Sequence, residues 1–363
     1  MYKCKASSNF EMMELDKMGK VRPKVQENIN KPPKSLANLT LVSMARTRFP
    51  GNIPSETIKN ITSTREFHLK AFLISEKEQL LVFIGILLMY LMSVLGNLLI
   101  VTLVCLVSHL HTPMYVFLCN LAVQDCLYVS TLLPKLLDIT ISGKTSISFS
   151  GCIAQIFLFV CCIDTEFFLL TFMAYDRYLA ICSPLHYALI MNRKLCALLI
   201  AVSWCFGFLN AIIFSLLVSN LSFCDNQINH FFCDVTIILK LSCSDITYMI
   251  IFIFVEAIVL GWSPFFLILT SYIFIISTIL KIKSSKGRSK TFSSCSSHLT
   301  VVILFYGTSL TLNLKTKSKN SMEIEKLLSM LYIGVVPMVN PLVYSLRNKD
   351  VLRAIKSLFK KLK

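Results

Sequence analysis

An Asp-Arg-Tyr triplet lies at the end of a long apolar stretch of this sequence. Residues 173–182 read MAYDRYLAIC and follow an apolar run that begins near Cys152. Charged side chains at the edge of a membrane helix are costly unless they pair or extend to the lipid headgroups. Asp176 and Arg177, followed by Tyr178, are therefore expected to pair with each other; the alternative is an ordinary arginine that extends to the headgroups.

Four further polar residues lie deep inside apolar runs, where each is expensive and is therefore a functional candidate. They are Asn97, Asp125, Glu166 and Asn340. We expect them to face the interior of a helix bundle, with the two acids accommodated by a shared cation, a protonated carboxyl or a water network. The alternative is a hydrogen-bonded cluster that only holds the helices together.

A proline follows the last of these residues, in the string PMVNPLVY. Pro341 lacks an N–H group and therefore frees a backbone carbonyl in the preceding turn. We expect Asn340 and water to satisfy the freed carbonyl, which would give a local kink that can move.

The elements that position these residues are membrane-spanning helices. The chain has 363 residues, of which 55% are hydrophobic and 15% charged, too apolar a composition for one soluble core. The sequence predicts an all-α membrane protein with seven spans, the sixth being the weakest because serine and threonine dilute it. The predicted spans are Leu80–Val107, Tyr115–Leu137, Cys152–Tyr175, Leu195–Val218, Tyr248–Leu280, Ser297–Leu314 and Leu327–Leu346.

Basic residues give the orientation, because they mark the cytoplasmic side of short loops. Residues 281–290 and the tail after the seventh span are rich in lysine and arginine. This predicts a multi-pass protein of the cell membrane with the N-terminus outside and the C-terminus in the cytosol. The net charge of +16 indicates contact with anionic membrane lipid, not nucleic acid, since no basic helix carries interleaved aromatic residues.

The chain divides into four predicted parts. Residues 1–57 are polar, basic and proline-punctuated, so we expect a disordered extension. One hypothesis is that this extension belongs only to the gene model. Residues 58–79 are an extracellular segment, 80–346 the spans, and 347–363 a tail with a short amphipathic helix on the cytoplasmic surface. Glycosylation sequons begin at Asn38 and Asn60.

Four of the 14 cysteines lie on the predicted outer side, in an oxidising compartment where bridges are expected. They are Cys152, Cys224, Cys233 and Cys243, and their spacing leaves three pairings open. No spacing typical of a metal site occurs, no cofactor is expected, and no nucleophile and base constellation indicates an enzyme.

Several ordered motifs together resemble those of rhodopsin-like G-protein-coupled receptors, specifically the vertebrate olfactory receptor family. Coverage runs from about residue 60 to the C-terminus. The motifs are Gly96-Asn97, LHTPMY (110–115), MAYDRYLAIC (173–182), PLHY (184–187), Ser271-Tyr272, KTFSSCSSHL (290–299), Phe305-Tyr306-Gly307 and PMVNPLVYSLRN (337–348).

The resemblance implies a receptor for small, mostly apolar odorants that activates the olfactory stimulatory G protein and raises cyclic AMP. It implies that Arg177 is held by its neighbouring acid and released on activation, with Tyr272 and Tyr344 rearranging. It also implies that Cys152 pairs with Cys233 and Cys224 with Cys243. The switch residues implied are Asp176, Arg177, Tyr178, Tyr272, Asn340, Pro341 and Tyr344.

We expect the ligand pocket in the outer half of the bundle, between spans three, five, six and seven. Glu256 lies about two helical turns before Pro264 and would face that cavity, which predicts a preference for amines or hydrogen-bond donors. The alternative is that Glu256 bonds to a neighbouring span. The other candidates, whose apolar members are equally explained by helix packing, are Phe159, Ile163, Asp164, Leu260, Tyr306, Leu310 and Met330.

Two other functions remain as alternatives at this point. A receptor of the same family for a non-odour ligand, expressed outside olfactory tissue, would have the same motifs. A membrane transporter would also be apolar, but transporters commonly carry internally repeated halves with interrupted helices, and no such symmetry is visible.

Overall fold

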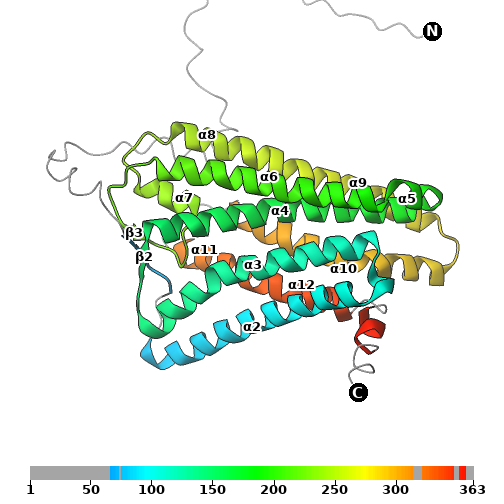
Figure 1. Ribbon diagram of the computed structural model, residues 1–363, viewed down its shortest axis with the longest axis horizontal. Coiled ribbons are helices and arrows are strands. Elements are labelled where there is room, and N and C mark those ends of the chain that lie inside the picture. Colours follow the sequence, from blue (N-terminus) through cyan, green and yellow to red (C-terminus); the bar gives the residue numbers. More distant parts are fainter. Residues whose placement is uncertain (1–65, 73–74, 314–320, 347–350, 357–363) are drawn as a thin grey trace, which may run out of the picture. The chain divides into compact units, whose positions relative to one another are not determined.

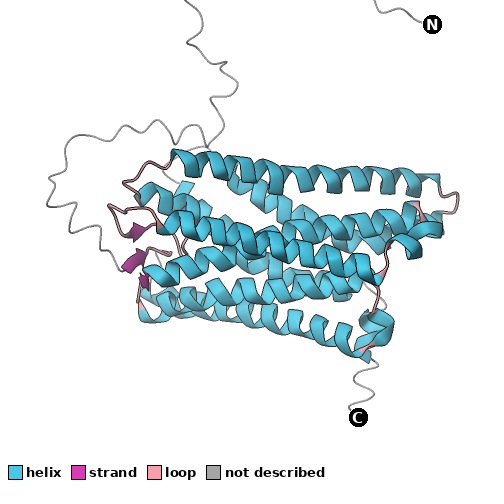
Figure 2. Cartoon of the chain, turned by 45° about the horizontal axis from the view of Figure 1, so that its top comes forward, coloured by secondary structure: helices cyan, strands magenta, loops and turns pink. Residues whose placement is uncertain are grey.

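The computed structural model describes residues 66–72, 75–313, 321–346 and 351–356. Within them, seven long helical segments pack side by side (Figures 1 and 2). The predicted seven-helix, mainly α-helical fold is confirmed. The segments are α2 (Glu76–Leu106), α3 (Pro113–Ser142), α4 (Phe149–Cys182), α6 (Arg193–Ser219), α8 (Thr247–Glu256) with η4 (Ala257–Trp262) and α9 (Ser263–Lys281), α10 (Ser285–Asn313), and α11 (Ser321–Met330) with η5 (Leu331–Val335) and α12 (Val336–Leu346).

Six of these seven segments are long and apolar enough to cross a membrane by themselves. The remaining one is α10, which is the predicted sixth span that serine and threonine dilute. Helix α10 begins at Ser285 inside the basic segment, 12 residues before the predicted span Ser297–Leu314. Apolarity marks only the part of a helix that lies in lipid, and a helix can continue into water.

Turn residues set several helix ends. Ser148 precedes α4 and its Oγ accepts a hydrogen bond from the Gly151 N–H at 3.1 Å. Asn192 precedes α6 and caps it in the same way through the Leu195 N–H at 3.0 Å. Gly143 follows α3 with φ of 67°, a left-handed conformation that favours glycine. These caps satisfy backbone groups that the helix itself leaves free.

Prolines coincide with irregular turns in two spans. The π-helical turn η4 ends just before Pro264, and the π-helical turn η5 ends shortly before Pro337. Proline cannot donate the regular backbone hydrogen bond, so the helix adjusts its winding beside it. Spans five and seven therefore each consist of two α-helical pieces joined by a π-helical turn.

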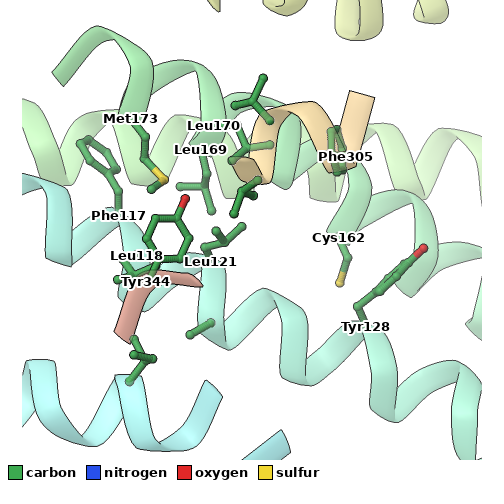
Figure 3. Close-up of a cluster of buried hydrophobic side chains, with 14 of the residues drawn as sticks. Phe117, Leu118, Leu121, Tyr128, Cys162, Leu169, Leu170, Met173, Phe305 and Tyr344 are labelled. Carbon is green, nitrogen blue, oxygen red and sulfur yellow. The ribbon is translucent and has the colours of Figure 1, made fainter. Parts of the chain in front are cut away.

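Large apolar side chains fill the centre of the bundle. Figure 3 shows Phe117 and Leu121 of α3 beside Leu169 of α4, with Tyr344 of α12 among them. All four are at most 3% exposed. Other large apolar side chains, on the outer faces of α2, α6 and α9, remain exposed, as lipid contact requires.

A small sheet at one end of the bundle adds strands that the all-α prediction did not include. Strand β1 (Glu66–Leu69) lies between β2 (Ser146–Ser148) and β3 (Gln227–Ile228), in the order β2-β1-β3. It is antiparallel to β2 and parallel to β3. The predicted extracellular segment thus contains an ordered strand, and two of its own side chains, Phe67 and Leu69, are buried.

The short elements complete the connections, and residues 351–356 of the tail are helical. Val351 and Ala354 are buried, so this piece of the predicted amphipathic helix packs on the described bundle. The extension 1–57, the sequons at Asn38 and Asn60, and the rest of the tail lie outside the described residues. The remaining short elements are η2 (Ser108–Leu110), α5 (Pro184–Ile190), α7 (Val235–Ile238) and η3 (Leu239–Leu241).

Helices α4 and α6 approach closely at Gly207. A Cβ atom on Gly207 would lie 2.6 Å from the Cys161 carbonyl oxygen and 2.6 Å from the Thr165 hydroxyl. Backbone atoms cannot move aside as a flexible side chain can. Only glycine therefore permits this helix contact.

We expect Gly207→Ala to destabilise the protein by roughly 1–3 kcal/mol, because the added methyl overpacks the contact. Gly85→Ala is the matched control, since a Cβ there meets nothing within 4 Å. It should be neutral or slightly stabilising, as for other helical glycines. Thermal unfolding of the purified variants measures both changes, and equal melting temperatures would contradict the assignment.

His230 lies in the loop between α6 and α8 and is 2% exposed. Its ring stacks on Phe231 and meets Phe232 edge-on, each with centroids 4.6 Å apart. Burial lowers the pKa of His230 to about 4, with the ammonium groups of Lys326 and Lys240 adding to the effect and the Asp234 carboxylate opposing it. The ring is therefore neutral at pH 7.

Acid should weaken this loop through His230. An unfolded histidine has a pKa of about 6.5, so the unfolded chain binds the proton first and stability falls as the pH drops from about 6.5 towards 4. Near pH 5.5 the loss is roughly 1 kcal/mol. Melting temperatures at pH 7 and pH 5.5 should differ less in His230→Gln than in the native protein; the same pH dependence in both would contradict this role.

Candidate functional site

The Asp176 carboxylate holds Arg177 at one end of α4. The Arg177 Nε donates to Asp176 Oδ2 at 2.9 Å, and a second guanidinium nitrogen contacts the same oxygen. Asp176 is fully buried, whereas the Arg177 side chain is 17% exposed. A buried carboxylate beside an arginine forms a charge-assisted pair of the stronger kind. Tyr178 lies on the same turn and its ring is 5.9 Å from that of Phe274 on α9.

A tyrosine from the next helix completes this pair. Tyr187 lies on α5, which Pro184 begins, and its hydroxyl donates to Asp176 Oδ1 at 2.8 Å. Burial, followed by the neighbouring Asp176 carboxylate, raises the pKa of Tyr187, so the hydroxyl keeps its proton. Both oxygens of Asp176 are thus occupied, one by Arg177 and the other by Tyr187.

A second polar contact joins three spans close to this end. The Tyr272 hydroxyl of α9 lies 2.7 Å from His298 Nδ1 of α10, and His298 Nε2 lies 3.1 Å from the Leu170 carbonyl oxygen of α4. A carbonyl can only accept, so Nε2 carries the proton and Nδ1 accepts from Tyr272. His298 is completely buried. Helices α4, α9 and α10 cannot separate here without breaking one of these bonds.

The predicted polar residues of the core pair across helices. Asn340 of α12 donates to Asp125 Oδ2 of α3 at 2.9 Å. Gln124, also on α3, donates to Glu166 Oε2 of α4 at 3.2 Å. Each acid therefore has an amide partner, and all four side chains are at most 3% exposed.

The partner of the carbonyl that Pro341 frees differs from the prediction. Asn340 does not bond to it, because its amide donates to Asp125. Asn97 of α2 donates instead to the Pro337 carbonyl oxygen at 3.0 Å. A Cβ on Gly96 would lie 2.8 Å from Pro341 Cγ, so glycine allows α2 to approach closely enough for this bond.

Several buried polar atoms of this core have no protein partner within the described part of the chain. Asp125 Oδ1 and Glu166 Oε1 are among them. Unpaired buried oxygens are costly in an apolar interior. The cluster between α3, α4 and α12 therefore contains polar atoms whose hydrogen-bonding capacity the described side chains do not satisfy. The other such atoms in the same part of the core are Ser93 Oγ, Gln124 Oε1, Asn340 Oδ1 and Tyr344 Oη.

Asp164 and Glu256, two of the pocket candidates, share one amide. Asn210 of α6 donates to Asp164 Oδ2 at 2.7 Å and lies 3.5 Å from Glu256 Oε1. Glu256 therefore has a partner on the fourth span, which is the alternative to its facing an open cavity. Asp164 is 1% exposed. The amide brings together acids from spans three and five.

Aromatic rings connect the outer loop to the bundle. Phe232, next to Cys233, lies 5.1 Å from the pocket candidate Phe159, which lies 5.7 Å from Tyr128 of α3. Tyr128 meets Tyr332 of η5 at 6.1 Å. Tyr332 in turn lies 5.5 Å from Phe305, the neighbour of the candidate Tyr306. These contacts form the aromatic series, which runs from the loop between α6 and α8 to α10.

The other pocket candidates are half-buried. Ile163 and Met330 pack against the main apolar cluster from α4 and α11. Leu260 lies on the π-helical turn η4 and Leu310 near the end of α10. The structure thus places Phe159 and, through Phe305, Tyr306 in the aromatic series and the two acids on Asn210, whereas these four residues belong to neither group.

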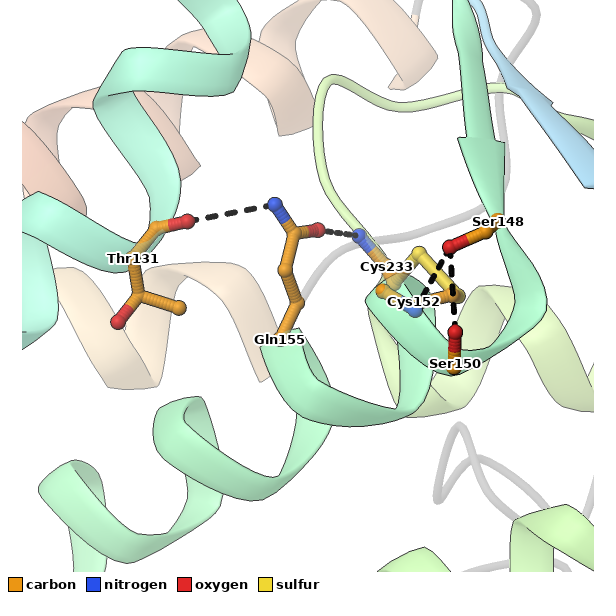
Figure 4. Close-up of a disulfide and its surroundings, with 7 residues drawn as sticks. Thr131, Ser148, Ser150, Cys152, Gln155 and Cys233 are labelled. Atoms are coloured by element: carbon orange, nitrogen blue, oxygen red, sulfur yellow. Dashed lines mark hydrogen bonds between the residues drawn. A yellow bond between two sulfur atoms is a disulfide. The ribbon is translucent and has the colours of Figure 1, made fainter.

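Two disulfides hold the loop between α6 and α8, in the pairing that the resemblance implied. Cys152 of α4 pairs with Cys233, and Cys224 with Cys243. Gln155, one turn into α4, accepts from the Cys233 N–H at 3.2 Å and donates to the Thr131 carbonyl of α3 at 3.3 Å (Figure 4). Covalent and polar bonds together fix this loop on the bundle.

Sequence reasoning missed several partners at these sites. Tyr187 lies in the motif PLHY and His298 in the motif KTFSSCSSHL. A polar side chain within such a motif was the signal that could have indicated a hydrogen-bond partner. Gln124 neighbours Asp125, and Asn210 is a lone amide within an apolar span. Within the described residues, no cluster of three or more metal-ligating side chains occurs.

Comparison with known proteins identifies the family. Residues 86–361 match the family model described as olfactory receptor. The chain is 46% identical to olfactory receptor 13F1 of Homo sapiens over 300 aligned residues. The aligned region covers 82% of this chain and 94% of that protein. It is 47% identical over 308 aligned residues to olfactory receptor 1E16 of Mus musculus, and the alignment covers 85% of this chain and 98% of that protein.

A third relative, olfactory receptor 1496 of Rattus norvegicus, is 48% identical over 299 residues, 82% of this chain and 96% of that protein. These matches cover the bundle and every polar contact described above. They exclude the transporter alternative and an enzyme. The chain belongs to the olfactory receptor family and is a multi-pass membrane receptor.

Proposed function

We propose that this protein binds small, mostly apolar odorants in the outer half of its bundle and activates a stimulatory G protein of the olfactory class, which raises cyclic AMP. The observation that carries the proposal is the Asp176 carboxylate, fully buried and bonded to both Arg177 and Tyr187. Such a pair is stable only while both partners remain in place. Releasing Arg177 is a discrete event that a partner in the cytosol can detect.

Helix movement can cause this release. Tyr272 and His298 tie α9 and α10 to the Leu170 carbonyl of α4, seven residues before Arg177. A ligand that shifts α10 outward breaks this bond, and Tyr272 is then available to a freed guanidinium. Two polar contacts, on Asp176 and on His298, thus define the resting state, and ligand binding shifts the population away from it.

An exposed apolar patch next to the switch supports docking of a G protein. Leu185 and Leu189 lie on α5, the helix that also carries Tyr187, and are 89% and 75% exposed. Large apolar side chains on a helix outside the predicted spans mark a binding surface. Docking on α5 would act directly on the Tyr187 bond to Asp176.

The proposed orientation places α5 and the Asp176 pair in the cytosol and the strands β1 to β3 outside. The disulfides support it, because Cys152 closely follows β2 and Cys224 and Cys233 flank β3, so both bridges lie with the strands. Bridges persist in oxidising compartments. The basic residues of 281–290 lie on the opposite side, where α9 ends and α10 begins.

Arg177→Ala should reduce the odorant-evoked rise of cyclic AMP by about tenfold or more. The substitution removes the guanidinium that the Asp176 carboxylate releases. The measurement is cyclic AMP in cells expressing the chain with an olfactory stimulatory G protein, over a panel that includes amines and neutral odorants. Surface staining verifies that each variant reaches the membrane.

Arg193→Ala is the matched control, an exposed arginine at the start of α6 on the same side. It should respond as the native protein does. A full response from Arg177→Ala at equal surface density would contradict the switch. Silence of the native protein despite surface staining would count against the ligand class proposed here.

We further propose that Glu256 with Asp164 favours amines. Two acids share the single Asn210 amide, so an ammonium group would add a second hydrogen-bond donor between them. This proposal concerns ligand preference, and it is independent of how the switch works.

Glu256→Gln should raise the concentration for half-maximal response to primary aliphatic amines by about tenfold, the factor expected for losing a charged hydrogen bond. Alcohols of the same chain length should be unaffected. The same cyclic AMP assay measures both series. Equal potencies of native protein and variant across amines and alcohols would disprove the amine preference.

A further inference from the structure

Residues 66–72 form a strap along the outer end of the bundle, and the sheet holds its first part by main-chain bonds. The His68 N–H donates to the Asn226 carbonyl at 2.8 Å, and the Lys70 N–H to the Ile228 carbonyl at 2.7 Å, on one side. On the other side the Leu69 N–H donates to the Thr145 carbonyl at 2.9 Å. The strap therefore bridges the loop between α3 and α4 and the loop between α6 and α8.

A lysine of span seven holds the far part of the strap. Lys326 of α11 donates from Nζ to the Ala71 carbonyl oxygen at 2.7 Å and to Glu323 Oε1 at 2.9 Å. Its side chain is only 5% exposed, whereas that of Glu323 is 52% exposed. Burying an ammonium group is costly unless its donors are satisfied, so the Ala71 carbonyl gives Lys326 a strong preference for the closed strap.

The strap covers the outer end of the aromatic series. Phe72 stacks on Phe231 with centroids 5.7 Å apart and planes 21° from parallel. Phe231 lies 5.2 Å from Phe232, which contacts the pocket candidate Phe159. Only two rings, those of Phe231 and Phe232, thus separate the strap from the candidate pocket along this series.

We propose that the strap is a gate over the ligand site, closed by the bond from Lys326 to the Ala71 carbonyl. The proposal rests on the ligand site proposed above, because that site is what the gate would cover. The two ends of the strap differ physically. The main-chain bonds of His68, Leu69 and Lys70 and the buried Phe67 and Leu69 fix the first part. A flexible side chain holds the second, so residues 71 and 72 can lift while β1 stays paired.

This arrangement predicts how apolar ligands reach the pocket from water. Lifting the strap would separate Phe72 from Phe231 and expose the outer end of the series. The lysine would keep its Glu323 partner in the open state, so opening costs one charged hydrogen bond and one ring contact. Such a small cost allows the gate to open frequently.

Lys326→Met tests the gate, because methionine fills the lysine volume without donating a hydrogen bond. Hydrogen exchange of the purified full-length receptor should show faster exchange of the Lys70 amide, the hydrogen-bonded amide next to the lifting residues, by about tenfold. Labelling of Ile163→Cys by a methanethiosulfonate reagent added outside should accelerate by a similar factor in the Lys326→Met background. The native protein gives the labelling background of its own cysteines.

Lys135→Met is a closely matched control. Lys135 of α3 also donates to a carboxylate three residues away, Asp138 at 2.9 Å, and to a backbone carbonyl, that of Lys144 at 3.0 Å, but it does not contact the strap. Both rates should equal the native values in this variant.

Unchanged strap exchange in Lys326→Met would disprove the role of the lysine. Faster strap exchange with unchanged labelling of residue 163 would show that the strap is no gate. Neither readout uses an odorant or a G protein. The outcome is therefore distinguishable from failure of the cyclic AMP response.

Discussion

Polar groups inside the bundle must find partners on neighbouring helices, since lipid offers none. This constraint explains most of the polar contacts in the structure. Asn340 reaches Asp125, Gln124 reaches Glu166, and Asn97 of α2 takes the carbonyl that the proline of α12 frees. Each bond joins two spans, so moving one helix exposes a polar group that has to be satisfied elsewhere. The bundle can therefore exist in a few discrete arrangements, which a receptor needs.

Helix α4 connects the two ends of the molecule. At one end a disulfide and the Gln155 bonds fix it to the loop between α6 and α8 and to α3. At its other end Asp176 holds Arg177 and Tyr187 by polar contacts alone. A disulfide cannot exchange partners, whereas the ion pair of Asp176 with the partly exposed Arg177 can, provided that another group then satisfies the buried carboxylate. The asymmetry suits a protein that keeps its outer loop fixed while its inner end rearranges.

The outer end combines this rigidity with one weaker contact. Disulfides and the three-stranded sheet fix the loops, and the Lys326 bond to the Ala71 carbonyl holds only the last part of the strap. Prolines contribute in the same sense within the spans, because the π-helical turns η4 and η5 divide spans five and seven. Local weak points in a stiff frame allow small parts to move without loss of the fold.

The sequence by itself determined the seven spans, their order, the polar residues of the core and the family, because composition and apolar run length depend only on local chemistry. It also marked Asp176 and Arg177 through their place at the end of an apolar run. Only the tertiary structure decided the partners: that Asn97 takes the freed carbonyl, that Glu256 shares Asn210 with Asp164, and that a strand and Lys326 close the outer end. Those contacts join residues far apart in the chain, and which faces meet depends on the packing of whole helices.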